Sequence, residues 1–224
     1  MTAGHIVLVR HGRTAYNAAM RLQGQIDIDL DEVGRWQAGL VAQTLGNTVR
    51  PSKLIVSDLR RAVDTARAIG AHLGLEPIQD VRVRERSFGP WEGKTGAEIS
   101  EHWPTEYQQW RGGAEPTVDG IESKTQVAAR MVEVILEHAE QLDDSETLCV
   151  VSHGAAISCA IAGLLDQDAT QWRGVAGMSN AHWSRLARNT ANGAHPRWRI
   201  EQHNVGPSVF LGKETWENGL PEQP

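Results

Sequence analysis

The chain has 224 residues, 40% of them hydrophobic, and this size is sufficient for one well-buried core. Its formal net charge of −6 excludes nucleic acids and anionic membrane surfaces as partners, because those partners attract an excess of basic residues. Two cysteines, Cys149 and Cys159, are too few for a disulfide scaffold, and no apolar stretch reaches the roughly 18 residues that a membrane-spanning helix needs. We therefore expect a cytoplasmic protein.

Short aliphatic runs alternate with longer amphipathic segments along the chain, which is typical of an α/β protein. Residues 6–9 predict a first buried strand. The apolar residues of 30–45 recur at helical spacing, so they predict a helix, and Gly46 is its expected stop. Residues 54–56 predict a second short strand.

The segment after the second strand predicts a helix that ends at Gly74, with Ser57 or Asp58 as its N-cap. Residues 125–140 predict another helix. The stretch TLCVVSHGAAISCAIAGLL then repeats the opening arrangement of a buried strand, a His-Gly pair and an apolar helix. This order predicts a three-layer α/β/α fold with a mostly parallel central sheet.

Residues 88–120 contain three prolines and three tryptophans and lack a clear period, so we expect an inserted cap with a short helix at 95–111. The rest of 1–224 is expected to form one domain around it. The polar tail from Trp216 onward predicts a loosely held end.

Polar residues follow each predicted strand at its carboxyl end. In an open parallel sheet these ends meet in one crevice, where ligands bind. The residues are Arg10, His11 and Gly12 after the first strand, Ser57 and Arg60 after the second, and His153 and Gly154 after the last.

Two arginines and two histidines in one crevice predict an anion site, and a glycine after each histidine allows a ligand to approach the backbone. Phosphate is the anion with which neutral His11 can react as a nucleophile. Glu85, preferred to Glu92, is the candidate acid for the leaving group. Arg61 and Arg67 are expected on the solvated face of their helix.

The histidines outside this set show no ligand spacing such as H-E-x-x-H, so we predict no metal ion and no cofactor.

Five stretches, LVRHGRTAYN, LQGQIDIDLDEVGR, SDLRRAVDTA, RERSFGPWEG and VVSHGAAI, resemble the successive signatures of the histidine phosphatase superfamily, which includes the cofactor-dependent phosphoglycerate mutases. The resemblance extends over about 200 residues. It implies a metal-independent reaction through a phosphohistidine. The residues that it implies are His11 as nucleophile, Arg10, Asn17, Arg60 and His153 at the phosphate, Glu85 as acid and base, and Gln23 and Gly24 on the substrate.

Three functions remain open: a phosphatase for a small phosphorylated metabolite, a mutase, and a non-catalytic phospho-ligand module. Mutases of this family carry a longer Lys/Arg-rich insertion after Glu85, whereas residues 86–120 contain only Arg86, Lys94 and Arg111 as such cations. This favours hydrolysis. A binding module would lack a catalytic residue, and none is missing.

The segments GMSNAHWSRL and RWRIEQHN resemble actinobacterial members that hydrolyse glucosyl-3-phosphoglycerate, and the family resemblance also implies a homodimer. The cap aromatics Trp91, Trp103, Tyr107 and Trp110 suit the C–H faces of a sugar ring. Alternatively, they only anchor the insertion.

Overall fold

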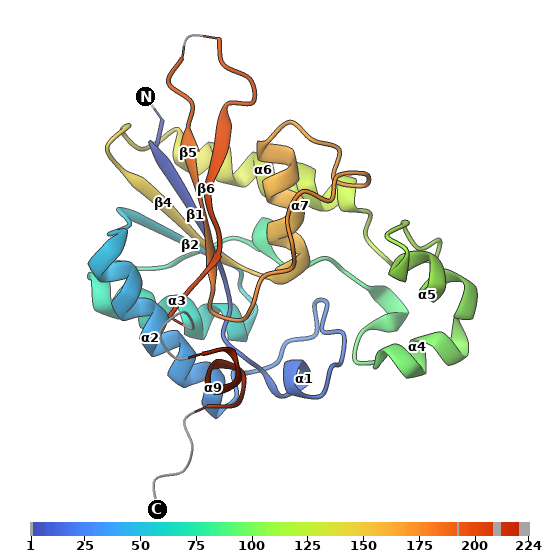
Figure 1. The fold of residues 1–224 in the computed structure, drawn as a ribbon. Coiled ribbons are helices and arrows are strands. Elements are labelled where there is room, and N and C mark those ends of the chain that lie inside the picture. Colours follow the sequence, from blue (N-terminus) through green and yellow to red (C-terminus); the bar gives the residue numbers. More distant parts are fainter. Residues whose placement is uncertain (1, 192, 208–211, 220–224) are drawn as a thin grey trace, which may run out of the picture.

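A six-stranded sheet forms the centre of the computed structural model, which describes residues 2–191, 193–207 and 212–219 (Figure 1). The strand order is β3-β2-β4-β1-β5-β6. Strands β1 to β4 run parallel, β5 is antiparallel to β1, and β6 is antiparallel to β5. The strands are β1 (His5–Arg10), β2 (Lys53–Val56), β3 (Ile78–Gln79), β4 (Thr147–Ser152), β5 (Trp183–Arg188) and β6 (Trp198–Val205).

Helices cover both faces of this sheet, which confirms the predicted three-layer, mostly parallel α/β/α fold (Figure 1). Two further helices, α4 and α5, stand to one side of the sheet. The helices are α1 (Ala15–Ala18), α2 (Glu32–Thr48), α3 (Arg60–Leu73), α4 (Gly96–His102), α5 (Pro104–Arg111), α6 (Lys124–Ala139), α7 (Gly154–Leu164) and α9 (Lys213–Asn218).

Alternation along the central strands divides the core into two layers. Ile6 and Leu8 of β1 pack with α6 and α7, whereas Val7 and Val9 pack with α2 and α3. Each fully buried side chain of this kind stabilises the fold by about 1.5–3 kcal/mol. A strand that is apolar on both faces can lie only in the middle of the sheet, and its end is therefore held rigidly.

Helix α2 does not stop at Gly46, as predicted, but continues to Thr48. A Cβ at Gly46 would lie 2.4 Å from the His72 ring of α3. The glycine therefore allows two helices to approach, which a single-helix pattern cannot reveal.

The predicted N-cap of α3 is also wrong. Leu59 occupies the cap position without a side-chain hydrogen bond. The next backbone N–H, that of Arg60, donates to Asp27 Oδ1 at 2.8 Å. A carboxylate from a distant loop thus caps this helix.

The predicted cap helix at 95–111 is two helices, α4 and α5, joined at Trp103. Pro104 cannot continue a helical hydrogen-bond ladder and disfavours the helical conformation for the residue before it. Trp103 accordingly has φ −134° and ψ 61°. Trp91 is 0% exposed and packs among Phe88 and Ile99, so it anchors the insertion.

The C-terminal segment is not loosely held where the structure describes it. Trp216 of α9 is 1% exposed, and its ring lies 5.4 Å from the rings of Trp36 and His182. Its indole N–H donates to the Asn180 carbonyl at 2.9 Å. The predicted loose end at 220–224 lies outside the described residues.

Both cysteines are free and buried. In the described part of the chain, no helix combines the length and the hydrophobicity that crossing a membrane requires.

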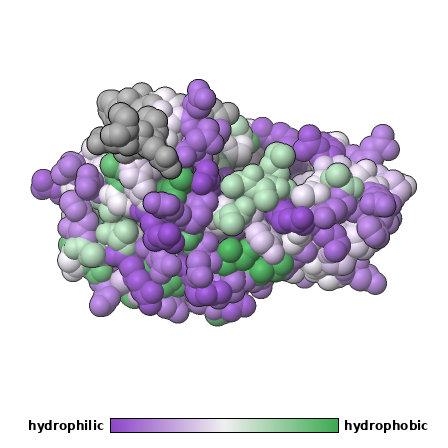
Figure 2. Space-filling view, turned by 90° about the horizontal axis from the view of Figure 1, so that it is seen from below, coloured by the Kyte–Doolittle hydropathy of each residue, from purple (hydrophilic) through white to green (hydrophobic). Residues whose placement is uncertain are grey.

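The carboxyl ends of β1 and β4 lie on the side of the molecule that carries α1 and α9 (Figure 1). Seen from that side, the surface is mostly hydrophilic, with small hydrophobic patches between polar side chains (Figure 2).

Candidate active site

His11 lies directly after β1 and is 2% exposed. Its Nδ1 is 2.7 Å from the Gly12 carbonyl oxygen. A carbonyl can only accept a hydrogen bond, so Nδ1 carries the ring proton. The lone pair of His11 is therefore on Nε2.

The loop after His11 is pressed against α2 and α3. A Cβ at Gly12 would lie 2.4 Å from the Gly34 carbonyl oxygen of α2. The Gly12 N–H donates to Thr65 Oγ1 of α3 at 3.1 Å. Gly12 thus serves the contact with a helix, and not the approach of a ligand that the sequence predicted.

His153 lies directly after β4, and its ring centroid is 5.1 Å from that of His11. Arg61 Nε donates to His153 Nδ1 at 3.2 Å. A guanidinium only donates, so the ring proton of His153 is on Nε2. That atom is buried and has no hydrogen-bond partner among the described residues.

Both histidines are held in the neutral form. Burial lowers the pKa of His11 well below 6.5, and the charges of Arg61 and Arg10 lower it further. Burial likewise lowers the pKa of His153, followed by the charge of Arg61. His11 therefore keeps a lone pair on Nε2 and His153 keeps an N–H there, in rings whose centroids are 5.1 Å apart.

The arginine of α3 at this site is Arg61 and not Arg60. Arg61 is 0% exposed, whereas the Arg60 side chain is 55% exposed and forms ion pairs with Asp27 and Asp29. Successive residues of a helix point about 100° apart, so only one of the two can face the histidines. Arg67 is on the solvated face, as predicted.

Arg61 is fixed by two backbone carbonyls as well as by His153. Its Nη1 donates to Ile26 at 2.7 Å, and its Nη2 donates to Gly24 at 2.8 Å. Each of these nitrogens has a second N–H. Burial lowers the pKa of Arg61 to about 10, and the Glu85 carboxylate opposes that effect. Arg61 remains a cation at neutral pH.

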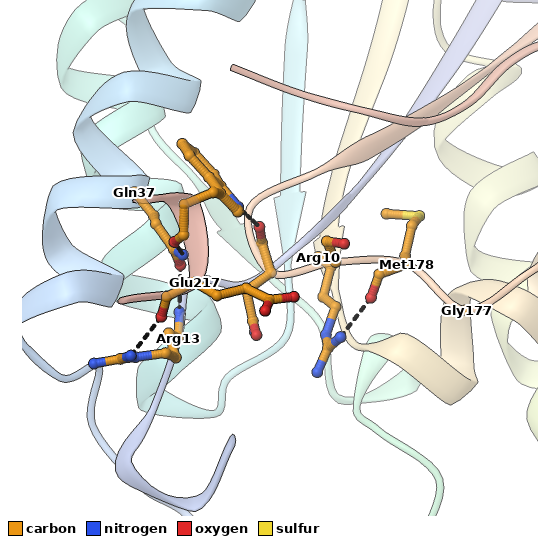
Figure 3. Close-up of a pocket in the computed structure, with 9 residues that line it drawn as sticks. Arg10, Arg13, Gln37, Gly177, Met178 and Glu217 are labelled. Carbon is orange, nitrogen blue, oxygen red and sulfur yellow. Dashed lines mark hydrogen bonds between the residues drawn. The ribbon is translucent and has the colours of Figure 1, made fainter. Parts of the chain in front are cut away.

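Arg10 approaches the two histidines from the end of β1. Its Nη1 donates to the Met178 carbonyl, and its Nε is buried without a partner among the described residues (Figure 3). Burial lowers the pKa of Arg10, and the Glu85 carboxylate opposes this. Arg10 also lines a cavity of about 230 Å³ that Asn180 and Trp216 border.

Glu85 is fixed at the N-terminus of α7. Its Oε1 accepts the N–H groups of Arg86 and Ala156, both at 2.8 Å, and its Oε2 accepts that of Ala155 at 3.2 Å. The stretch before Glu85 is a 3₁₀ turn, Val81–Val83.

The alternative acid, Glu92, connects two segments of the chain through its carboxylate. Its Oε1 accepts the N–H groups of Gln25 and Phe88, at 3.1 and 2.9 Å. It thus joins the cap to the loop after α1.

Asn17 and Gln23 both contact Thr14. Asn17 Oδ1 accepts from the Thr14 N–H at 3.1 Å, and Gln23 Oε1 accepts from the Thr14 hydroxyl at 2.9 Å. Asn180 Nδ2 reaches Asn17 Oδ1 at 3.2 Å and the His11 carbonyl at 3.1 Å. Asn17 therefore lies beside the His11 loop.

Two further predicted residues are glycines. Gly24 positions Arg61 through its carbonyl, and its φ of +52° and the nearby Glu92 side chain leave no room for a Cβ. Gly154 begins α7, where a Cβ would make only ordinary contact with Arg10 Nε, at 3.6 Å.

Sequence reasoning missed Arg61, Thr65 and Asn180. Arg61 directly follows Arg60, the arginine that was predicted. The positions of the two arginines on the helix relative to the buried Ala62 and Thr65 are the signal that distinguishes them. Asn180 offered no local signal.

Two neutral histidines beside two arginines, at the carboxyl ends of central parallel strands, form a site that can bind a phosphoester and react with it. The chain belongs to the histidine phosphatase superfamily (branch 1), whose family model matches residues 6–204, and it is a phosphomonoesterase of that family.

Two kinds of relative have sequences similar to most of this chain. A glucosyl-3-phosphoglycerate phosphatase of Mycobacterium tuberculosis is 37% identical over 93% of this chain and 98% of its own. A probable phosphoglycerate mutase of Yersinia pestis is 38% identical over 71% of this chain and 74% of its own.

A solved mycobacterial glucosyl-3-phosphoglycerate phosphatase, complexed with VO3, has the same fold. It superposes with a TM-score of 0.82 at 36% identity, and the match covers 90% of this chain and 99% of that one.

Proposed function

We propose that this chain hydrolyses glucosyl-3-phosphoglycerate to glucosylglycerate and phosphate through a phosphohistidine on His11. The observation that carries the mechanism is the hydrogen bond from His11 Nδ1 to the Gly12 carbonyl, because it leaves the Nε2 lone pair facing the cationic site.

The phosphoryl group would be bound by Arg10, Arg61 and the Nε2–H of His153. Unpartnered buried polar atoms on Arg10 and His153 support this assignment, since such atoms are costly unless a ligand satisfies them. Donors fixed before the reaction stabilise the charge that develops on phosphorus without reorganising. Asn17, beside the His11 loop, is the further phosphate contact that we propose, and we propose Gln23 and Gly24 as residues on the substrate side.

In the first step, His11 Nε2 attacks phosphorus and the bond to the ester oxygen breaks. The departing alkoxide takes a proton from Glu85, and we assign that proton to Oε2, which accepts only the Ala155 N–H. In the second step, water attacks the phosphohistidine and gives a proton back to Glu85. Phosphate leaves, and His11 is again neutral.

Two observations support the glucosylated substrate. Sequence identity to the mycobacterial phosphatase extends over nearly the whole of both chains, whereas identity to the probable mutase covers 71% of this chain. In the cap, Tyr107 and Trp110 border a cavity of about 480 Å³, which gives the aromatic surface that a sugar ring prefers.

The test is a phosphate-release assay with glucosyl-3-phosphoglycerate and 3-phosphoglycerate. We expect kcat/KM for the glucosylated substrate to be at least about tenfold higher, which corresponds to roughly 1.4 kcal/mol of transition-state binding by the sugar. Equal kcat/KM for 3-phosphoglycerate would contradict the assignment of glucosyl-3-phosphoglycerate as the substrate. Formation of 2-phosphoglycerate from it would indicate a mutase.

A further inference from the structure

A second cavity, of about 240 Å³, lies beside Glu85 and is not used by the mechanism above. Its lining includes a face of α7 with Ala155 and Cys159, and also Trp172. Three cations, Arg86, Lys124 and Arg173, line it as well.

The cavity adjoins the proposed acid directly. The Ala155 N–H donates to Glu85 Oε2, and the Arg86 N–H donates to Glu85 Oε1. Both donors belong to residues that line the cavity. A leaving group whose ester oxygen receives a proton from Glu85 therefore has this space next to it.

Ion pairs hold two of the three cations of the cavity. The Arg86 side chain is 2% exposed and pairs with Glu115 at 2.9 Å, and Lys124 pairs with the same carboxylate at 3.4 Å. Arg173 pairs with no carboxylate among the described residues. Glu115 is thus shared by Arg86 and Lys124, and Arg173 lies outside this pair of salt bridges.

The thiol in this lining supplies no compensating charge. Burial raises the pKa of Cys159 to about 11, and the Glu85 carboxylate adds to that effect. Cys159 is therefore a neutral thiol at physiological pH.

Two of the cations converge on one backbone carbonyl of the cap. Arg173 Nη2 donates to the Gly113 oxygen, and Lys124 Nζ lies 3.4 Å from it. A carbonyl oxygen carries only a partial negative charge, so this pair of donors is better matched to a carboxylate. Arg173 also keeps N–H groups that the Trp172 and Gly113 carbonyls do not occupy.

We propose that this cavity binds the carboxylate of the substrate's leaving group, with Arg173 and Lys124 as its contacts and Arg86 as a fixed charge behind them. The proposal rests on the proposed phosphatase reaction, because Glu85 must face the leaving group. Arg173, which forms no ion pair among the described residues, is the cation that we expect to meet this carboxylate first. This site makes the enzyme selective for phosphoesters of hydroxy acids.

Binding measured without turnover tests this directly. In a His11→Ala protein, calorimetric dissociation constants are compared for 3-phosphoglycerate and glycerol 3-phosphate, which differ only in a carboxylate against a hydroxymethyl group. We expect 3-phosphoglycerate to bind about tenfold more tightly, as one charge-assisted contact allows. Adding Arg173→Gln should reduce that preference about fivefold, since this arginine is partly solvated.

Lys124→Gln should lower the same preference, and Arg67→Gln, an exposed arginine of α3, is the matched control that should leave it unchanged. A preference that survives both Arg173→Gln and Lys124→Gln would overturn the proposal. Tighter binding of 2,3-bisphosphoglycerate than of 3-phosphoglycerate would also overturn it, because the cavity would then accept phosphate. Failure of the proposed function appears separately, as wild-type protein that releases no phosphate from glucosyl-3-phosphoglycerate.

Discussion

The two strand-histidine-glycine units differ in what their histidines can do, although their sequences are nearly alike. Strands β1 and β4 are parallel neighbours, so His11 and His153 leave the sheet side by side. Nδ1 of His11 faces a carbonyl, whereas Nδ1 of His153 faces a guanidinium. The two rings therefore have opposite tautomers, and only His11 presents a lone pair to the site.

The segments after the two histidines differ as well. After His11 the chain forms a loop that Thr65 and Asn180 hold. After His153 the helix α7 begins at once, and its first N–H groups fix Glu85. We therefore propose that the first unit positions the nucleophile and that the second positions an N–H donor to the phosphate together with the acid.

The largest expected effect on activity is the difference between substitutions of the two histidines. His11→Ala should lower kcat by at least about 10⁴-fold, because the nucleophile is lost. His153→Ala should lower it by about 10²–10³-fold, as the loss of one donor to developing charge does. His153→Gln, which keeps an N–H donor, should be less impaired. Steady-state assays with p-nitrophenyl phosphate measure all three, and equal losses for His11→Ala and His153→Ala would contradict the difference in roles.

The adjacent arginines of α3 form a matched pair. Arg61→Gln should reduce kcat/KM by about 10²-fold or more, since it removes a charge from the phosphate and the hydrogen bond that sets the His153 tautomer. Arg60→Gln should stay within about threefold, as expected for a solvated ion pair. Circular dichroism of Arg61→Gln controls for folding. A larger loss for Arg60→Gln would restore Arg60 as the phosphate ligand.

Glu85→Gln should lose about 10²-fold in kcat/KM with glycerate esters, because their alkoxide needs a proton. The loss should be smaller with p-nitrophenyl phosphate, whose leaving group is stable as an anion. Assays on both substrates test this, and equal losses would indicate a structural role for Glu85 at the α7 N-terminus.

The smallest effect is a pH dependence of stability. The pKa of His153 is lower in the folded protein than the value of about 6.5 of an unfolded histidine, so the unfolded chain binds more protons as pH falls below 6.5. Its contribution to stability is complete above pH 6.5 and is lost as pH falls toward the folded pKa.

Urea unfolding between pH 7 and 5.5 measures this change. The slope of unfolding free energy against pH should be up to about 1.4 kcal/mol per unit smaller in His153→Gln than in the wild type. Unchanged slopes would mean that His153 titrates normally in the folded protein.

Elements with a clear local apolar pattern, whether a short buried run or a helical period, were predictable from the sequence. Strands β1, β2 and β4 and helices α6 and α7 agree with the expected ranges to within one or two residues. The predictions of a helix stop at Gly46, of the α3 cap and of a loose end at Trp216 were wrong. Each of these features depends on a residue far away in the sequence, such as His72 or Asp27. Local sequence does not specify such contacts.

The candidate site divides in the same way. His11, His153 and Arg10 could be predicted from strand ends and are found together. Whether Arg60 or Arg61 faces the histidines depends on the exact rotation of α3 about its axis. The predicted start of this helix was off by one or two residues, so the sequence could not decide between the two arginines.

The most direct measurement is to locate the phosphoryl group on the trapped intermediate. Enzyme mixed with substrate is quenched in alkali, which preserves phosphohistidine, and is then digested and mapped by mass spectrometry, with NMR to assign the ring nitrogen. The tautomers predict phosphate on Nε2 of His11 and none on His153. Phosphate on His153, or on Nδ1 of His11, would contradict the assignment of the nucleophile.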